Sequence, residues 1–249
     1  MSLSESSLPT MPLSGHLAEL RRRILVSGLA WLAASVAAWP LVPDVVSFLA
    51  SQVGRLVFVT PAEAFVSMVK IAAILGLIAA SPIILVEAWL FVLPGLFPNE
   101  RRLVYRLAPV VILLFVLGIL FSWFVMLPFM LTFFLGFETE RIHATITISR
   151  FLSFLIGVTL PFGLVFQLPL ITYTLTRVGA VSARFWGQMR RYVIFLAFII
   201  AAILTPPDPV SQTLLAIPLL LLYEVGAWVA RMAERRRRRP ALLPEEVEP

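Results

Sequence analysis

The chain has 249 residues, of which 60% are hydrophobic and only 14% are charged, and its mean hydropathy is +0.95. Since a soluble domain carries roughly 25% charged residues, this composition excludes an ordinary soluble domain and favours a protein whose solvent is the lipid bilayer. The net charge of +6 does not indicate nucleic-acid binding, because the arginines stand at the ends of apolar runs. The chain has no cysteine and only two widely separated histidines, so we expect neither a metal site nor a cofactor.

The N-terminal part combines a tail with a first apolar run. Residues 1–13 contain Ser and Pro without periodicity, and we interpret them as a flexible tail. The run over about residues 24–40 has a basic flank and small residues, so taken alone it is similar to a cleavable signal peptide. Because further apolar runs follow, we expect an uncleaved first transmembrane helix. After it, Asp44 is expected to cap a short amphipathic helix on the membrane surface.

Five further apolar runs follow the first. The second, third and fourth are long enough to cross a hydrocarbon core of about 30 Å as helices. The fifth would form a helix only roughly 20 Å long. The sixth begins with polar residues, so both spans are expected to be short. We place the five at about residues 64–93, 107–135, 151–175, 192–204 and 210–229. Together with the first run they form a predicted six-helix domain over residues 14–232, followed by a basic and then acidic tail over residues 233–249.

The arginines predict the orientation of these helices. Three arginines lie in one set of loops, Arg55, Arg141 and Arg150, and sixteen lie in the other set of loops and tails. Since positively charged loops remain in the cytoplasm, we expect the N-terminus and the C-terminus to be cytoplasmic. The sixteen are Arg21, Arg22, Arg23, Arg101, Arg102, Arg106, Arg177, Arg184, Arg190, Arg191, Arg231 and Arg235 to Arg239.

Prolines recur inside or beside the predicted spans. Each removes a backbone donor and bends a helix, which favours curved helices around a concave face; the alternative is that membrane helices simply tolerate proline. The predicted fold is therefore an all-α membrane protein of six transmembrane helices. The prolines are Pro82, Pro128, Pro161, Pro169 and Pro218.

Three stretches in this order resemble the signatures of TatC, a protein family of the twin-arginine translocase. They are HLAELRRR from His16, FVLPGLFPNERR from Phe91, and LTPPD from Leu204 followed by Ser211 and Gln212. The resemblance covers about residues 13–231. It implies a receptor in the bacterial cytoplasmic (inner) membrane, not an enzyme. Such a receptor binds the twin-arginine signal peptides of folded proteins and exports them with TatA, TatB and other TatC copies, using the proton-motive force.

The resemblance also implies which residues take part. Glu19 and Glu100 match the family's acids that receive the arginine pair. Arg21, Phe91, Pro94, Arg101 and Arg102 belong to the same two cytoplasmic stretches, and Pro206 and Asp208 match the outer turn. At Gln167, in the fourth span, many members carry a glutamate. A glutamine keeps hydrogen bonding to a partner helix but cannot ionise.

The residues themselves leave other interpretations open. Glu19 stands four residues before Arg23, the spacing of a helix ion pair, and Glu100 stands where it would support the start of the next helix. Lys70 and Glu87, near the two ends of the second span, are expected to reach their own interfaces. Glu224 in the sixth span has two candidate partners, another helix or a neighbouring arginine.

Two other functional classes are disfavoured. A secondary transporter would show two related halves, and the first and last three spans differ in length, loop size and proline placement. An intramembrane hydrolase would need a motif such as G-x-S-x-G or H-E-x-x-H, and the sequence has neither.

Overall fold

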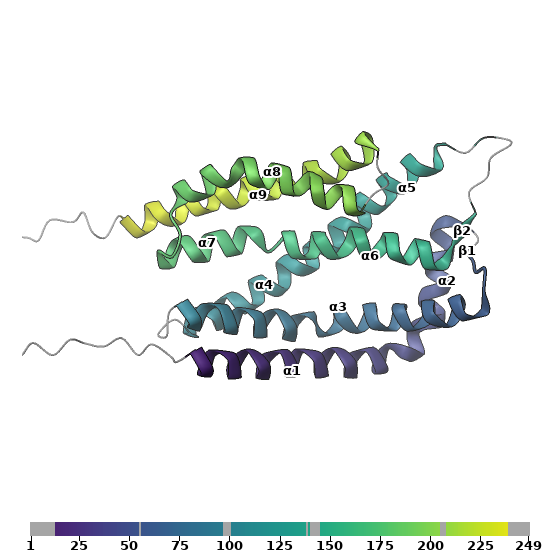
Figure 1. Ribbon diagram of the computed structural model, residues 1–249, viewed down its shortest axis with the longest axis horizontal. Helices are drawn as coiled ribbons and strands as arrows, with labels where there is room; N and C mark the ends of the chain where they lie inside the picture. Colours follow the sequence, from purple (N-terminus) through teal and green to yellow (C-terminus); the bar gives the residue numbers. More distant parts are fainter. Residues whose placement is uncertain are drawn as a thin grey trace, which may run out of the picture. The chain divides into compact units, whose positions relative to one another are not determined.

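The computed structural model describes residues 13–54, 56–96, 101–137, 139, 145–204 and 208–238. Six helical segments are long and apolar enough to cross a membrane, in agreement with the predicted fold (Figure 1). The described chain divides into two compact units, one within residues 1–45 and 69–110 and the other within residues 46–68 and 111–249. Each unit is described by itself below.

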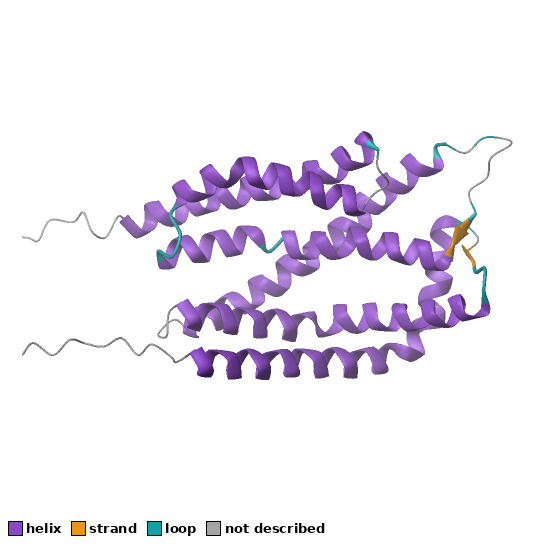
Figure 2. Cartoon of the chain, in the orientation of Figure 1, coloured by secondary structure: helices purple, strands orange, loops and turns teal. Residues whose placement is uncertain are grey.

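The described elements are almost all helical (Figure 2). The exception is a pair of two-residue strands, β1 and β2, which run parallel with Leu56 opposite Ile146. The elements in chain order are α1 (Leu13–Ala38), η1 (Trp39–Leu41), α2 (Val42–Val53), β1 (Leu56–Val57), α3 (Pro61–Leu96), α4 (Arg101–Phe121), η2 (Ser122–Met126), α5 (Leu127–Leu135), β2 (Ile146–Thr147), α6 (Ile148–Val165), α7 (Leu168–Val178), α8 (Ala183–Leu204) and α9 (Pro209–Arg238).

In the first unit α1 and α3 lie side by side (Figure 1). The Trp31 indole N–H donates to the Ala73 carbonyl at 2.8 Å. One turn further along, a Cβ on Gly76 would lie 2.5 Å from the Ser35 Cα atom, so only glycine permits this approach of the two backbones. Most of the remaining surface of α1 is apolar and exposed, with Leu29 66% and Val36 68% exposed. An apolar helix face this open is the kind that lipid covers.

In the second unit, α9 packs against both α7 and α8 (Figure 1). Small and hydroxyl side chains make the close approach of α7 to α9 possible. The Thr172 hydroxyl on α7 donates to the Gly226 carbonyl on α9 at 2.8 Å. A hydrophobic core next to this pair joins α5, α6, α8 and α9, and its fully buried members include Val158, Phe162 and Leu215.

Helix ends follow recognisable sequence signals. Pro61 and Pro209 stand at the first positions of α3 and α9, where no backbone N–H is needed. The Thr60 hydroxyl accepts the Glu63 N–H at 3.2 Å, and the Glu63 carboxylate accepts the Val59 N–H at 2.8 Å. This reciprocal arrangement satisfies donors that the first helical turn leaves open. At its C-terminus, α7 is capped by Gly179, whose φ of 84° lies in the left-handed region that glycine adopts without strain.

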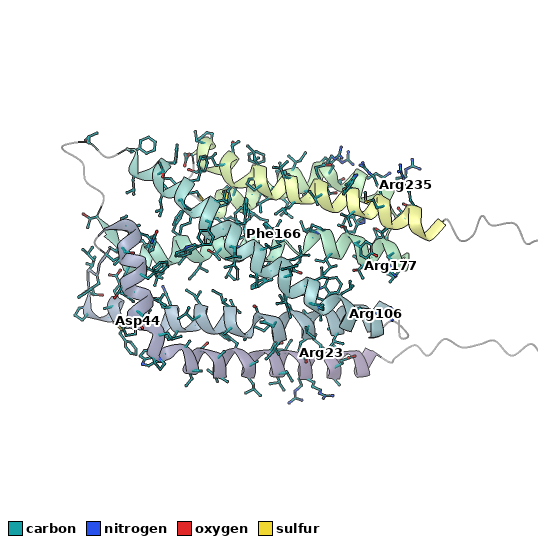
Figure 3. The ribbon with its side chains drawn as sticks, turned by 180° about the vertical axis from the view of Figure 1, so that it is seen from behind. Arg23, Asp44, Arg106, Phe166, Arg177 and Arg235 are labelled. Carbon is teal, nitrogen blue, oxygen red and sulfur yellow. The ribbon has the colours of Figure 1, made fainter. Side chains whose placement is uncertain are left out.

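Two of the five prolines coincide with departures from α-helical geometry. A π-turn, η2, separates α4 from α5 just before Pro128. The helices α6 and α7 are separated at Phe166, which Figure 3 labels, and Gln167, just before Pro169. Because proline offers no N–H to the carbonyl four residues earlier and its ring crowds that carbonyl, the preceding turn must change its hydrogen bonding. The helices α3, α6 and α9 continue through Pro82, Pro161 and Pro218.

The boundaries differ from the predicted spans at two places. The amphipathic helix after the first span is present as α2, but it begins at Val42, so Asp44 lies in its first turn and not at its cap. The apolar run over residues 192–204 forms only the C-terminal part of α8, which begins at Ala183 and includes three arginines. Arginine is a good helix former, so the helix extends beyond its apolar portion.

Candidate functional site

The predicted acid Glu19 lies on α1 in a network with Arg23 and Glu87. The Arg23 Nε atom donates to Oε1 of Glu19 at 3.2 Å, and its Nη2 atom makes a second, shorter contact with the same oxygen. Its Nη1 atom donates to Oε2 of Glu87 at 2.8 Å. The three side chains are 17% to 23% exposed, so their charges are only partly screened by solvent.

This network answers two of the open alternatives. The helix pair between Glu19 and Arg23 does form. Glu87, which was expected to reach its own interface, has its carboxylate paired with Arg23 on the neighbouring helix. A contact between residues 64 positions apart leaves no local pattern in a sequence, which is why sequence reasoning missed the partner of Glu87.

A groove lies beside the network, between α1 and α3, with a volume of about 460 Å³. Arg23, Glu87 and the predicted site residue Phe91 line it together with apolar side chains. Phe91 follows Glu87 by four residues, which places both on one face of α3. Arg21, by contrast, is exposed on α1.

Several predicted site residues lie partly or wholly outside the described residues. Glu100 and Pro206 lie outside the described residues. Pro94 lies within α3, and Arg101 and Arg102 begin α4, but their side chains are outside the described part of the chain.

Gln167 occupies a buried position in the second unit, at 4% exposure. Its Nε2 atom donates to the Val111 carbonyl on α4 at 3.0 Å. Its Oε1 atom has no hydrogen-bond partner among the described residues. The amide therefore joins the broken turn between α6 and α7 to α4 through a donor that an ionised glutamate lacks.

Glu224 on α9 pairs with Arg190 on α8, with 2.6 Å between Oε1 and Nε. Of the two partners considered from the sequence, the structure therefore shows the neighbouring arginine. Both side chains are nearly half exposed, and a pair this open contributes little stability in water. Near it, the Tyr223 hydroxyl donates to the Trp186 carbonyl, and the Ala183 N–H donates to the Glu234 carboxylate at 2.9 Å, so polar contacts join α8 and α9 at several points.

Asp208 caps α9. Its carboxylate accepts the Ser211 backbone N–H at 2.7 Å and the Ser211 hydroxyl at 2.5 Å. These two hydrogen bonds hold the pKa of the Asp208 carboxyl below its usual range. Asp208, the acid of the LTPPD stretch, therefore stabilises the N-terminus of α9.

Within the second unit most of the described arginines gather at one end. Arg177 lies in the last turn of α7 and Arg235 lies in the last turns of α9, at the same end (Figure 3). Arg150, which belongs to the opposite set, lies at the start of α6. The charge asymmetry found along the sequence is therefore also present in the folded unit.

Comparison with known proteins gives a consistent result. The family model for the Sec-independent protein translocase protein TatC matches residues 15–218. The TatC protein of Carboxydothermus hydrogenoformans is 42% identical over 226 residues, covering 89% of this chain and 93% of that protein. The TatC protein of Aquifex aeolicus is 36% identical over 236 residues, covering 92% and 98%.

A solved structure agrees with these relatives. A crystal structure of the twin arginine translocase receptor TatC matches with a TM-score of 0.79 at 36% identity, covering 88% of this chain and 99% of that one. With its six apolar helices, the chain is a multi-pass membrane protein. It belongs to the TatC family, as its three sequence signatures predicted, and is a component of a protein translocase and not an enzyme.

Proposed function

We propose that this protein is the signal-peptide receptor of its translocase and that Glu19 and Glu100 receive the arginine pair of the signal. The observation that carries the proposal is the Glu19 carboxylate, which Arg23 holds in a fixed and partly exposed position at the start of α1. A planar guanidinium pairs best with a carboxylate that is already oriented. The solved relative is itself described as a receptor.

The other predicted residues have supporting roles in this proposal. Phe91 and Pro94 shape the first cytoplasmic stretch, and Arg21, Arg101 and Arg102 flank the two acids. Bidentate pairing explains why such a site would select arginine, since a lysine ammonium cannot present two parallel donors.

We further infer that the protein acts in the bacterial cytoplasmic membrane with TatA, TatB and other TatC copies, driven by the proton-motive force. Gln167 and Glu224 are the candidate contacts with partner helices. Because Gln167 cannot ionise, proton coupling in this proposal does not pass through that side chain.

An export assay tests the proposal. A bacterial strain that lacks its own TatC but keeps TatA and TatB is supplied with this chain and a folded reporter. We expect export of the reporter when its signal carries two arginines, and no export when both are lysines. Equal export of the two reporters would contradict a receptor that reads the arginine pair.

A further inference from the structure

The surface of α8 has a hollow of about 710 Å³ where its polar first turns meet its apolar part. Gly187 keeps the hollow open, because a Cβ there would meet nothing within 4 Å. Positions three, four and seven residues after Gly187 share its face of the helix. Arg190, Arg191 and Ile194 stand at these positions and line the hollow with it. Two arginines therefore lie beside an open space at the start of the apolar part of the helix.

One of these arginines carries a charge that no acid neutralises. Glu224 on α9 pairs with Arg190, whereas Arg191 pairs with no carboxylate in the described part of the chain. The Arg191 Nη2 atom donates to the Tyr192 hydroxyl at 3.0 Å, and its guanidinium carbon lies 4.8 Å from the centre of the Tyr192 ring. Since a guanidinium has five N–H donors, Tyr192 orients Arg191 and leaves donors for an anion.

An apolar strip continues from the hollow along the same face of α8. It consists of Phe195 and Phe198, four and seven residues after Arg191, which are 68% and 37% exposed. At 1.5 Å per residue the strip reaches about 10 Å beyond Arg191. Because α8 is long and apolar enough to cross a membrane, hydrocarbon covers such an open apolar face. The hollow therefore lies at the level of the lipid headgroups.

We propose that the hollow binds the headgroup of an anionic phospholipid, with the phosphate on Arg191 and the Gln188 amide and one acyl chain along the apolar strip. Gln188 also lines the hollow and supplies two further N–H donors. The inference concerns a lipid site on α8 and does not depend on how the signal peptide is recognised.

Charge and position select this occupant. One phosphodiester carries a single negative charge, which matches the single charge left by Arg191, and the guanidinium fork pairs with two phosphate oxygens at once. A soluble anion would pair with Arg191 but leave the apolar strip uncovered. A zwitterionic lipid would cover the strip, but its own cation competes with Arg191 for the phosphate. An anionic lipid satisfies both parts of the surface.

Lipid binding to the purified full chain tests the site. Native mass spectrometry gives the dissociation constant of the first bound lipid, for dioleoyl phosphatidylglycerol and for dioleoyl phosphatidylcholine. These lipids share their acyl chains and phosphate, so a difference in affinity reports the net charge of the headgroup. We expect phosphatidylglycerol to bind about fivefold tighter, the effect of one arginine on an anionic lipid. Equal binding would overturn the proposal and leave the hollow to another occupant, such as an acidic side chain of a partner helix.

Arg191→Gln removes the proposed phosphate contact. The variant should bind the two lipids with equal affinity, because the preference for phosphatidylglycerol rests on this charge. Arg191 is exposed, so the melting temperature without lipid should match that of the unaltered chain. A variant that keeps the full preference would overturn the proposal.

Arg177→Gln is the matched control. Arg177 on α7 also contacts a tyrosine, since its Nη1 atom donates to the Tyr173 hydroxyl at 2.7 Å. Leu170 and Thr174, seven and three residues before it, are buried, so Arg177 has no open apolar strip beside it. Arg177→Gln should therefore keep the preference for phosphatidylglycerol. A loss equal to that in Arg191→Gln would show a general attraction to the basic end of the protein and would overturn a specific site.

Gly187→Leu fills the hollow without changing any charge. The affinity for phosphatidylglycerol should fall several-fold, while melting without lipid stays unchanged or rises, because leucine is the better helix former. Gly28→Leu, at a glycine of α1 that also has open space around its Cβ position, should leave the lipid affinity unchanged. Unchanged affinity in Gly187→Leu would overturn the hollow as the headgroup site.

Glycerol phosphate separates the headgroup from the whole lipid. It carries the phosphate without acyl chains, so at equal concentration it should not displace bound phosphatidylglycerol. Equal displacement would show that the apolar strip contributes nothing to binding and would contradict a phospholipid site.

Discussion

The Arg23 guanidinium on α1 donates to the Glu87 carboxylate on α3 across 2.8 Å while it also pairs with Glu19 one turn away. Because one cation serves two acids, removal of either carboxylate leaves Arg23 paired with the other. A substitution at Glu19 therefore does not leave a bare charge in a partly buried place, which is the usual cause of a large loss of stability. This relationship makes Glu19 suitable for a binding test.

The first prediction concerns the two proposed signal-binding acids. Replacing Glu19 or Glu100 with Gln removes a charge-assisted partner worth about 1.5 to 3 kcal/mol, so the affinity for a twin-arginine peptide should fall about 10- to 150-fold. Both variants should still insert and fold. Peptide titration and thermal melting of each single variant in detergent provide the measurement.

The double variant serves as the control for that prediction. If both acids contact one ligand, the double variant should lose an amount of binding free energy that differs from the sum of the losses in the two single variants. If each acid only supports a helix, each replacement should lower stability by at most about 1 kcal/mol with unchanged peptide affinity. That pattern would remove both residues from the site.

The second prediction concerns orientation and follows from the arginine asymmetry. Single cysteines introduced next to Arg101 and Arg184 should react with a membrane-impermeant reagent only after the cytoplasmic side is exposed. A cysteine next to Arg150 is the matched control and should react in intact cells. Labelling at Arg101 or Arg184 in intact cells would refute the predicted orientation.

The third prediction concerns helix packing at Gly118 on α4. A Cβ there would lie 2.7 Å from the Phe162 carbonyl oxygen and 3.0 Å from the Gly163 Cα atom. Since these backbone atoms cannot rotate away as a flexible side chain can, Gly118→Ala should lower the free energy of unfolding by about 1 to 3 kcal/mol. Thermal melting in detergent measures this effect.

Gly187→Ala is the control for the packing prediction. It lies in a helix with nothing within 4 Å of its Cβ position, so it should be neutral or stabilising by up to about 1 kcal/mol. Equal melting temperatures for the two variants would contradict the observed approach of α4 to α6.

The fourth prediction concerns the pH dependence of the α9 cap. The Ser211 hydroxyl and N–H keep the pKa of Asp208 below the usual aspartate value of about 3.9. A lowered pKa means that the cap stabilises the fold above that value and is lost as the pH falls through the pKa of the folded state. The hydrogen-exchange protection of the Ser211 amide should therefore fall with acidification below about pH 4.

Asp208→Asn separates titration of the cap from other acid effects. Asparagine caps a helix about as well as aspartate but does not titrate, so protection in this variant should not depend on pH over the same interval. An identical loss of protection in both proteins would show that the carboxylate is not responsible.

Apolar runs and local spacing predict much of this fold. Particular residues show which features these two signals do not predict. The six spans and α2 follow from hydropathy, and the pair between Glu19 and Arg23 follows from a four-residue spacing. The start of α8 at Ala183 was not predicted, because hydropathy does not register helical turns that are rich in arginine. The prolines indicated neither which of the five positions would depart from α-helical hydrogen bonding nor the form of the departure, a π-turn before Pro128 and a break before Pro169.

Contacts between residues that are far apart in the sequence could not be predicted either. The pairs between Arg23 and Glu87, and between Arg190 and Glu224, depend on which faces of two helices meet. The sequence places Gln167 inside a span, whereas only the structure shows its donation to the Val111 carbonyl. Glu100 is proposed from the family resemblance alone.

Direct binding tests the receptor proposal most simply. The purified chain is titrated with a twin-arginine signal peptide and with the same peptide in which both arginines are lysines, at equal ionic strength. Since lysine keeps the charge but not the planar fork of donors, the account predicts binding of the first peptide at least tenfold tighter than the second. Equal affinity for the two peptides would contradict it.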